Sequence, residues 1–290
     1  MKNQTFGIEI ELTGLTREKA AKVIAEYFGT RATYISSYEV KDNANRTWKI
    51  MYDSSIRAEV KRGTATNNHK VELVSPICRY EDIETVQEIV RKLRKAGAIA
   101  NDSCGIHIHI GIGSHTPQTL RNLANIVASK EDMIYNSLQI AQYRSRYCKK
   151  ADANFIADIN KKKPKTMEQL ADIWYKRFPS ESRHAHYNSS RYHLLNYHST
   201  FTKGTIEFRC FNSEIKHAGK IKAYIQFCLA ISNQALIQKS ASAKKTITDN
   251  PKYTFRTWLL RLGLIGEEFK TARLHLLASL EGDIAWRNAA

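Results

Sequence analysis

The chain has 290 residues, of which 42% are hydrophobic and 25% charged, a balance typical of folded globular proteins and not of disordered chains. No apolar run approaches the ~20 residues that a membrane-spanning helix needs. Forty-five Lys and Arg residues against 28 Asp and Glu leave a net charge of +17, which favours polyanionic partners: nucleic acids, nucleotides or acidic substrates. The five cysteines form no C-x-x-C pair, which indicates a reducing compartment, and we expect a cytoplasmic protein.

Alternating apolar and polar residues predict strands along the chain. In chain order these cover residues 6–12, 33–40, 47–52, 71–76 and 104–110, followed by a pair at 191–198 and 204–211 around Thr202-Lys203-Gly204. Residues 56–70 have the polar, basic composition of a loop. This loop could clamp a substrate or form a disordered hairpin, and the sequence favours neither.

Helical periodicity and capping signals predict helices between and after these strands. They cover residues 16–28, 81–96, 117 to about 145, the stretch that opens at Thr166, and 215–238, with two short helices after Thr254 divided near Gly263. The basic run 161–165 has the composition of a loop before a helix. Because no repeat or low-complexity linker interrupts the chain, we predict one α+β domain over residues 1–240, with a helical extension over 241–290 packed on it.

Three of the predicted strands carry charged residues or histidines on one face and apolar residues on the other. Because successive side chains of a strand alternate, the following pairs share a face: Glu9 with Glu11, His107 with His109, and Glu207 with Arg209. Glu72, between Val71 and Leu73, adds a fourth carboxylate. Each pattern alone is typical of a solvated face or a cross-strand ion pair. Together they predict a divalent-metal site, because carboxylates packed among apolar residues repel one another unless a cation lies between them.

The ligand types favour magnesium over zinc. Zinc prefers nitrogen and sulfur ligands, whereas magnesium prefers carboxylate oxygens, so four glutamates with one or two histidines indicate Mg²⁺, or Mn²⁺, and more than one ion. Such a site beside an arginine suits phosphoryl transfer. The sequence has no G-x-x-x-x-G-K-[ST] loop, so ATP would be held through metals on a sheet and not at a helix N-terminus.

Five short motifs stand in order along residues 5–230. They are Phe6-Gly7-Ile8-Glu9-Ile10-Glu11, Tyr52-Asp53-Ser54-Ser55, Glu72-Leu73-Val74-Ser75-Pro76, Cys104-Gly105-Ile106-His107-Ile108-His109 and Gly204-Thr205-Ile206-Glu207-Phe208-Arg209. With these motifs the chain resembles the amidoligases, carboxylate–amine ligases of the glutamine synthetase and glutamate–cysteine ligase fold. The resemblance implies an α+β fold in which a curved antiparallel β-sheet carries the active site on its concave face, with helices packed behind.

The resemblance also implies residue roles. Two or three magnesium ions that bridge the ATP phosphates would be coordinated by Glu9, Glu11, Glu72, His107 and Glu207. The implied catalytic residues are Arg209 at the γ-phosphate, Asp53 and Arg191. The implied nucleotide- or substrate-binding residues are His109, Arg209, Ser55 and Asn196. Asp53-Ser54-Ser55 lacks the glycine of the family's usual Asp-Gly-Ser turn, which could alter the backbone there.

The implied reaction forms an amide or peptide bond from a carboxylate and an amine, through an acyl phosphate made with ATP. The partners would be an amino acid, a peptide or a cell-wall fragment, and the positive charge hints at an acidic one. Cys104 and Cys210 flank the site but are typical of small buried hydrophobic residues. Residues 143–147 could line a substrate groove, although a helix surface is the simpler interpretation.

Three other functions stay open. A zinc hydrolase would use His107, His109 and one glutamate, with a water as the fourth ligand. A nucleic-acid-binding protein would explain the net charge, although acidic residues on the sheet would repel phosphates. A degenerate, inactive ligase used as a binding module is the third.

Overall fold

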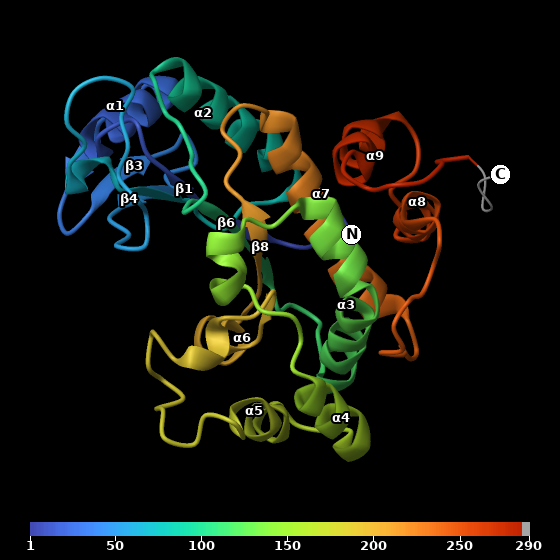
Figure 1. The fold of residues 1–290 in the computed structure, drawn as a ribbon. Coiled ribbons are helices and arrows are strands. Elements are labelled where there is room, and N and C mark those ends of the chain that lie inside the picture. The colour runs from blue at the N-terminus through green and yellow to red at the C-terminus, as the bar shows by residue number, and fades with distance from the viewer. Residues whose placement is uncertain (286–290) are drawn as a thin grey trace.

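The computed structural model describes residues 1–285 and has an α+β fold built on one antiparallel sheet (Figure 1). In this part of the chain the sheet has eight strands in the order β2-β3-β4-β5-β1-β6-β8-β7. The strands are β1 Phe6–Leu12, β2 Ala32–Tyr34, β3 Tyr38–Lys41, β4 Thr47–Met51, β5 Val71–Val74, β6 Gly105–Gly111, β7 Leu195–Asn196 and β8 Thr205–Asn212. Strands β1, β6 and β8 therefore lie next to one another although they are far apart in sequence.

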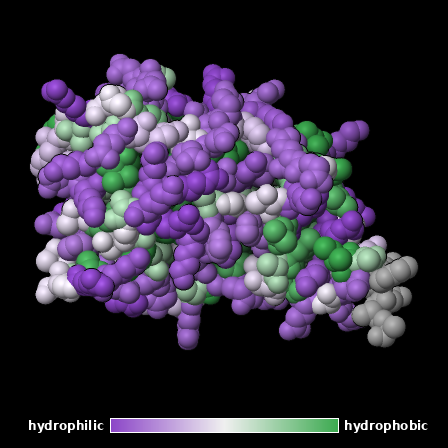
Figure 2. Space-filling model, turned by 90° about the horizontal axis from the view of Figure 1, so that it is seen from above, coloured by the Kyte–Doolittle hydropathy of each residue, from purple (hydrophilic) through white to green (hydrophobic). Residues whose placement is uncertain are grey.

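The helices pack mainly on one face of this sheet and beyond its β7 edge (Figure 1). They are α1 Arg17–Phe28, α2 Ile83–Lys95, α3 Pro117–Leu138, α4 Ala153–Lys162, α5 Met167–Tyr175, α6 His198–Lys203, α7 Ala218–Ile237, α8 Pro251–Arg261 and α9 Lys270–Leu277. Over residues 1–285, every helix is too short or too polar to cross a lipid bilayer. Seen from above, the surface is mostly hydrophilic (Figure 2), as the net charge of +17 requires.

The core lies between the sheet and helices α1, α2, α3 and α7. Ile8 and Ile10 of β1 and Ile106 and Ile108 of β6 are at most 1% exposed. Each such side chain contributes roughly 1.5–3 kcal/mol when it is buried. Helix α7 is apolar on most of its surface because it contacts α2, α3, α9 and β6 at once. The opposite face of the sheet is consequently left to the polar side chains that alternate with this apolar set.

Most predicted elements are confirmed within a few residues, and the exceptions have local causes. Residues 33–40 do not form one strand, because the chain bends at 35–37 and separates β2 from β3. The helix predicted to reach about residue 145 ends at Leu138, where Gln139 adopts the left-handed conformation with φ 48°. The run 161–165 is not wholly a loop, because Lys161 and Lys162 form the last turn of α4.

The strand pair predicted at 191–211 is wrong in its first half. Only Leu195–Asn196 pairs with β8, and residues 198–203 form the short helix α6 instead of a hairpin turn. The carbonyl of the Asn196 side chain accepts the His198 N–H (2.7 Å) at the start of this helix, and Gly204 ends it in the left-handed conformation with φ 66°. Asparagine before a helix and glycine after it are ordinary capping signals, but six residues are too few to show helical periodicity.

Candidate active site

The pairing of β1, β5, β6, β7 and β8 brings the predicted acidic and imidazole side chains onto one face of the sheet. In register, Glu9 lies opposite His107, Glu11 opposite Glu72, and Glu207 opposite both His109 and Asn196. We call Glu9, Glu11, Glu72, His107, His109 and Glu207 the acidic cluster. Strand alternation gave the face of each residue, and the register between strands determines which of them meet.

Glu9 is at the centre of the acidic cluster. Its Oε2 lies 3.0 Å from His107 Nδ1, and its Oε1 lies 3.2 Å from His109 Nε2. His109 Nδ1 is 2.9 Å from the Thr205 hydroxyl. Its buried Nε2, although close to Glu9 Oε1, is not aligned for a hydrogen bond with it or with any other described residue. A buried imidazole nitrogen of this kind, aimed at carboxylates, is a suitable donor for a metal ion.

Glu207 and Arg209 form the other side of the cluster. Glu207 accepts hydrogen bonds from the Arg209 guanidinium and, over 2.6 Å, from the Asn196 amide. A β-bulge occurs here: Ile106 pairs with Phe211 and Ile108 with Phe208, so β8 has one residue more than β6 in this stretch. Alternation along β8 places Arg209 on the same face as Glu207, and the extra residue lies in the stretch that runs past His107.

The electrostatics of the cluster are those of a site with excess negative charge. Burial and the neighbouring carboxylates of Glu9, Asp53 and Glu11 raise the pKa of Glu72 well above its usual range. Burial also acts to raise the pKa of Glu207, but Arg209 and the two histidines outweigh it and lower this pKa to about 2. Burial and the Arg209 charge lower the pKa of His107, which favours the neutral ring that a metal requires.

Three overlapping groups in the described residues could each hold a metal ion. They are Glu9 with His109 and Glu207, Glu9 with Glu72 and His107, and Glu11 with Asp53 and Glu72. Within each group one ligand atom per residue lies within 4.8 Å of the others. Carboxylate oxygens outnumber imidazole nitrogens in every group, a donor set that fits Mg²⁺ or Mn²⁺ better than Zn²⁺.

The turn after β4 brings Asp53 to the Glu11 and Glu72 end of the cluster. Asp53 Oδ1 accepts the Ser55 N–H over 2.7 Å, which closes the turn without the glycine of the family's usual sequence. Ser55 contributes to this turn through its backbone N–H. Among residues 1–285, its hydroxyl makes no hydrogen bond to the acidic cluster. The loop that follows is held near both of its ends, because Gly14 N–H donates to the Glu59 carbonyl (2.9 Å) and Arg17 donates to the Asn67 carbonyl (2.6 Å).

A basic pocket of about 180 Å³ adjoins Glu207 and Asn196. Its cationic or titratable lining residues are His184, His186, Arg191, His198 and Lys203. Lys203 Nζ also lies 3.7 Å from Glu9 Oε1, so the pocket opens directly beside the cluster. Arg191 and Asn196 were predicted from the sequence, whereas Lys203 and the histidines were not. The only sequence feature that could have indicated a role for Lys203 was its position directly before the Gly204 motif.

Arg144 lies in the stretch 143–147, which the sequence predicted as a groove lining or a helix surface, and its buried position was not expected. It is 2% exposed, and its guanidinium donates to the carbonyls of Arg209 and Phe211 in the bulged part of β8. The guanidinium lies on Gly105, where an added Cβ would come within 2.1 Å of Nη2. Residues 142–147 form a 3₁₀ segment in which only Arg144 is buried, so the interpretation of this stretch as a surface fails for Arg144 alone.

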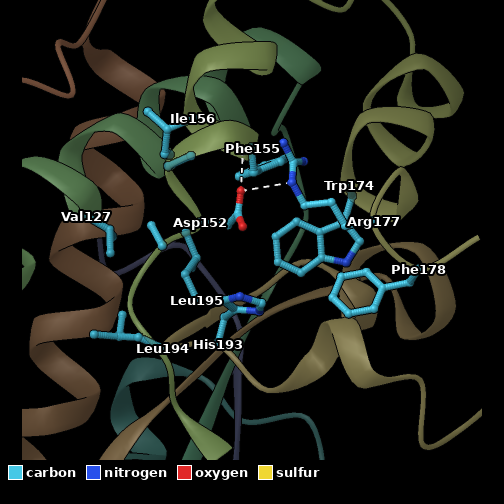
Figure 3. Close-up of a pocket in the computed structure, with 12 residues that line it drawn as sticks. Val127, Asp152, Phe155, Ile156, Trp174, Arg177, Phe178, His193, Leu194 and Leu195 are labelled. Atoms are coloured by element: carbon cyan, nitrogen blue, oxygen red, sulfur yellow. Dashed lines mark hydrogen bonds and ion pairs between the residues drawn. The ribbon is translucent and has the colours of Figure 1, made fainter. Parts of the chain in front are cut away.

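A second cavity, on the other side of β7, is unrelated to this chemistry. Leu195, whose neighbour Asn196 faces the cluster, lines a mainly apolar space of about 60 Å³ together with Phe155 and Trp174 (Figure 3). Its two charged residues are paired, because Asp152 accepts the Phe155 N–H (2.7 Å) and lies 3.1 Å from Arg177 Nε. The space is too small for a nucleotide, and we assign it to packing.

An antiparallel sheet with carboxylates and imidazoles gathered on one face, flanked by an arginine and a basic pocket, defines a polar site suited to binding cations and an anionic ligand. The amidoligase enzyme family model matches residues 2–232, most of the chain, and the protein therefore belongs to the amidoligase family. No curated protein matches the chain.

Proposed function

We propose that the protein is an ATP- and magnesium-dependent carboxylate–amine ligase with a glutamine synthetase-like fold. The observation that carries this proposal is the acidic cluster with its three overlapping ligand groups beside Arg209. A cation site next to an arginine suits phosphoryl transfer, in which negative charge must be stabilised on the transferred group. The catalytic domain would span residues 1–240, with 241–290 as its extension.

Magnesium would be held by Glu9, Glu11, Glu72, His107 and Glu207, with His109 as a further ligand beside Glu9 and Glu207. Asp53, next to Glu11 and Glu72, would be left for the reaction itself. Bound there, the cations would offset the carboxylate charges and those of the ATP phosphates. The raised pKa of Glu72 supports this assignment, because so many buried carboxylates are tolerated together only when a positive charge joins them.

The basic pocket would receive the ATP phosphates. Arg191 and Lys203 line it at the side where Glu207 meets Asn196, and guanidinium and ammonium groups are the usual protein partners of phosphate. Arg209, paired with Glu207, would contact the γ-phosphoryl group. This arrangement leaves the Glu11, Glu72 and Asp53 end of the cluster for the amine.

The reaction would proceed in two steps. An oxygen of the substrate carboxylate attacks the γ-phosphorus, and the bond from this phosphorus to the bridging oxygen breaks, which yields an acyl phosphate and ADP. The amine nitrogen then attacks the acyl carbon, and the carbon–oxygen bond to phosphate breaks. The nitrogen loses a proton as the amide forms, and we assign Asp53 as the acceptor of that proton.

No structural observation favours the zinc hydrolase, since carboxylates predominate in every ligand group. The net charge is also accounted for without a nucleic acid, because the substrates of the proposed ligase are anionic.

The experiment is an assay of magnesium-dependent ADP formation with a panel of amino acids and peptides, in which the wild type is compared with Glu9→Gln. The matched control is Glu39→Gln, which removes a carboxylate on β3 that pairs with Lys49 over 3.4 Å outside the cluster. We expect Glu9→Gln to lose turnover and Glu39→Gln to retain it. Equal turnover in Glu9→Gln and the wild type would overturn the mechanism.

A further inference from the structure

Alternating tyrosines and arginines form a band beside the active site, contributed by the 3₁₀ segment Gln142–Tyr147 and by residues 187–192. Arg146 lies over the rings of Tyr143 (4.5 Å to the centroid) and Tyr147 (4.8 Å). Tyr147 meets Tyr192 edge-on at 5.6 Å. Arg191 lies over Tyr192 (5.9 Å) and Tyr187 (5.5 Å). We call these six residues the Tyr–Arg band.

The band is tied to the active site at two points. The Tyr147 carbonyl accepts a hydrogen bond from Arg209 Nε over 3.4 Å, and Arg191 lines the basic pocket beside Glu207. Its two segments are joined by backbone hydrogen bonds, from Lys149 N to the Tyr192 carbonyl (3.0 Å) and from Leu194 N to the Lys149 carbonyl (2.8 Å). The band is therefore a fixed surface that leads into the catalytic cluster.

The arginines of the band lack acidic partners. For comparison, Arg57 pairs with Asp102 (2.6 Å) and Arg183 with Asp172 (2.7 Å) elsewhere on the surface. Within residues 1–285, neither Arg146 nor Arg191 forms an ion pair with a carboxylate, and Arg191 uses one N–H for the His186 carbonyl (2.9 Å). A guanidinium has five N–H donors, so those of Arg146 are left for a peptide, whereas those of Arg191 would be shared with the ATP phosphates in the basic pocket.

We propose that the Tyr–Arg band binds an acidic peptide segment and directs one of its side-chain carboxylates into the cluster. This inference rests on the proposed function, since a ligase must bring a carboxylate to the γ-phosphate. Guanidinium groups bind carboxylates with two parallel hydrogen bonds, and tyrosine and arginine are enriched where proteins bind partners. A single-stranded nucleic acid would also stack on such a surface, but it carries no carboxylate for the reaction.

The test is fluorescence anisotropy with a labelled peptide of six glutamates, without ATP or metal, compared with a peptide of six glutamines and with a six-nucleotide deoxythymidine strand. We expect the glutamate peptide to bind most tightly and its affinity to fall with salt. Arg146→Gln should weaken its binding roughly threefold, the effect of one exposed ion pair, and Arg146→Gln combined with Tyr187→Ala should weaken it further. The matched control is Lys92→Gln, which removes one charge over the Tyr27 ring (5.6 Å) on the helical side and should leave binding unchanged.

Three results would overturn the proposal: equal affinity for the glutamate and glutamine peptides, tighter binding of the nucleotide strand, or no effect of the double substitution. Because this binding is measured without nucleotide and metal, its outcome is independent of the ligase assay. If the protein shows magnesium-dependent turnover but does not prefer the glutamate peptide, only the peptide-binding inference is refuted. If it binds the glutamate peptide but shows no turnover, only the proposed ligase chemistry is refuted.

Discussion

Glu11 and Glu72 lie directly opposite each other on β1 and β5, so two carboxylates share one position across the sheet. Like charges in this arrangement destabilise paired strands by roughly 0.2–1 kcal/mol. The repulsion also appears in the pKa of Glu72, which burial, Glu9, Asp53 and Glu11 together raise. Without a bound cation the protein is therefore destabilised by repulsion between these carboxylates, and a bound cation would reduce that repulsion.

The first prediction concerns Glu72→Gln, which removes one of these charges. In the presence of a chelator, its melting temperature should exceed that of the wild type by roughly 1–3 °C. With added Mn²⁺ the order should reverse, because an ion at a hundredfold excess over its Kd adds about 2.7 kcal/mol to the protein that binds it. The measurement is thermal unfolding in both conditions. The control Glu39→Gln removes an attractive pair and should not raise the melting temperature, and a destabilised Glu72→Gln in chelator would contradict the prediction.

The second prediction concerns Arg209, which is buried beside Glu207. Burial acts to lower the pKa of Arg209, but the carboxylates of Glu207, Glu9 and Glu11 together outweigh it and raise this pKa. Arg209→Lys keeps the charge but loses the planar donor group, so kcat for ADP formation should fall roughly 10²–10³-fold. Arg57→Lys, at the exposed pair with Asp102, is the matched control and should retain the wild-type rate. An unchanged kcat in Arg209→Lys would show that this guanidinium does not contact the transferred group.

The sequence predicted the strands that carry the cluster because their signal is local. In 6–12 and 104–110 the period of two alone assigns Glu9 and His107 to the polar face. The register that places Glu9 opposite His107 is a property of two distant segments and could not be obtained from either one. The same limit applies to β8: alternation alone puts Arg209 on the face of Glu207, but the bulge beside it exists only in the pairing of β8 with β6.

Residues that reach the site from outside the sheet were the hardest to predict. Arg144 is placed by tertiary contact with Gly105, and no short-range pattern identifies such a pair. Lys203 closes a six-residue helix between two strands, and this helix was taken for a hairpin turn because its caps were the only helical signal. Asp53, by contrast, was found through its motif, since an Asx turn depends on neighbouring residues only.

The third prediction is a pH dependence of stability that originates in an ion-pair group outside the acidic cluster. Arg46 pairs with Asp42 and Asp82 (each 2.8 Å). Burial acts to raise the pKa of Asp42, but its hydrogen bonds from Arg46 and Trp48 outweigh it, and Arg46 likewise lowers the pKa of Asp82. A carboxyl group whose pKa is lower in the folded protein stabilises the fold at pH values above its pKa in the unfolded chain, about 3.9 for Asp. This stabilisation is lost as the pH falls through the pKa that the group has in the folded protein.

Arg46→Gln should therefore cost about 1–3 kcal/mol at pH 7, where both carboxylates are ionised, and progressively less below about pH 4. Urea unfolding at pH 7 and pH 3 measures the two differences. Arg94→Gln on α2, which loses only a backbone contact to Lys216, serves as the control and should show a small, pH-independent change. A deficit in Arg46→Gln that stays constant down to pH 3 would rule out the linkage.

The fourth prediction tests how Gly105 and Arg144 depend on each other. In Gly105→Ala the new Cβ would overlap the guanidinium, so Arg144 must leave the carbonyls of Arg209 and Phe211. The expected cost is about 1–3 kcal/mol, as for other overpacked sites. Arg144→Ala should remove the same two hydrogen bonds, and both variants should lower kcat because the bulge that holds Arg209 loses its support.

If one contact accounts for both effects, Gly105→Ala made in the Arg144→Ala background should cost much less than in the wild type, because the overlapping group is gone. Urea unfolding of the four proteins gives this coupling. Gly7→Ala is the matched control, a glycine on the same face of the sheet whose added Cβ would lie 3.8 Å from the Cβ of His109, an ordinary contact. Additive losses in the double variant would mean that Gly105 is required for a reason other than the close approach of Arg144, and the role assigned to residues 142–147 in supporting Arg209 would then have to be withdrawn.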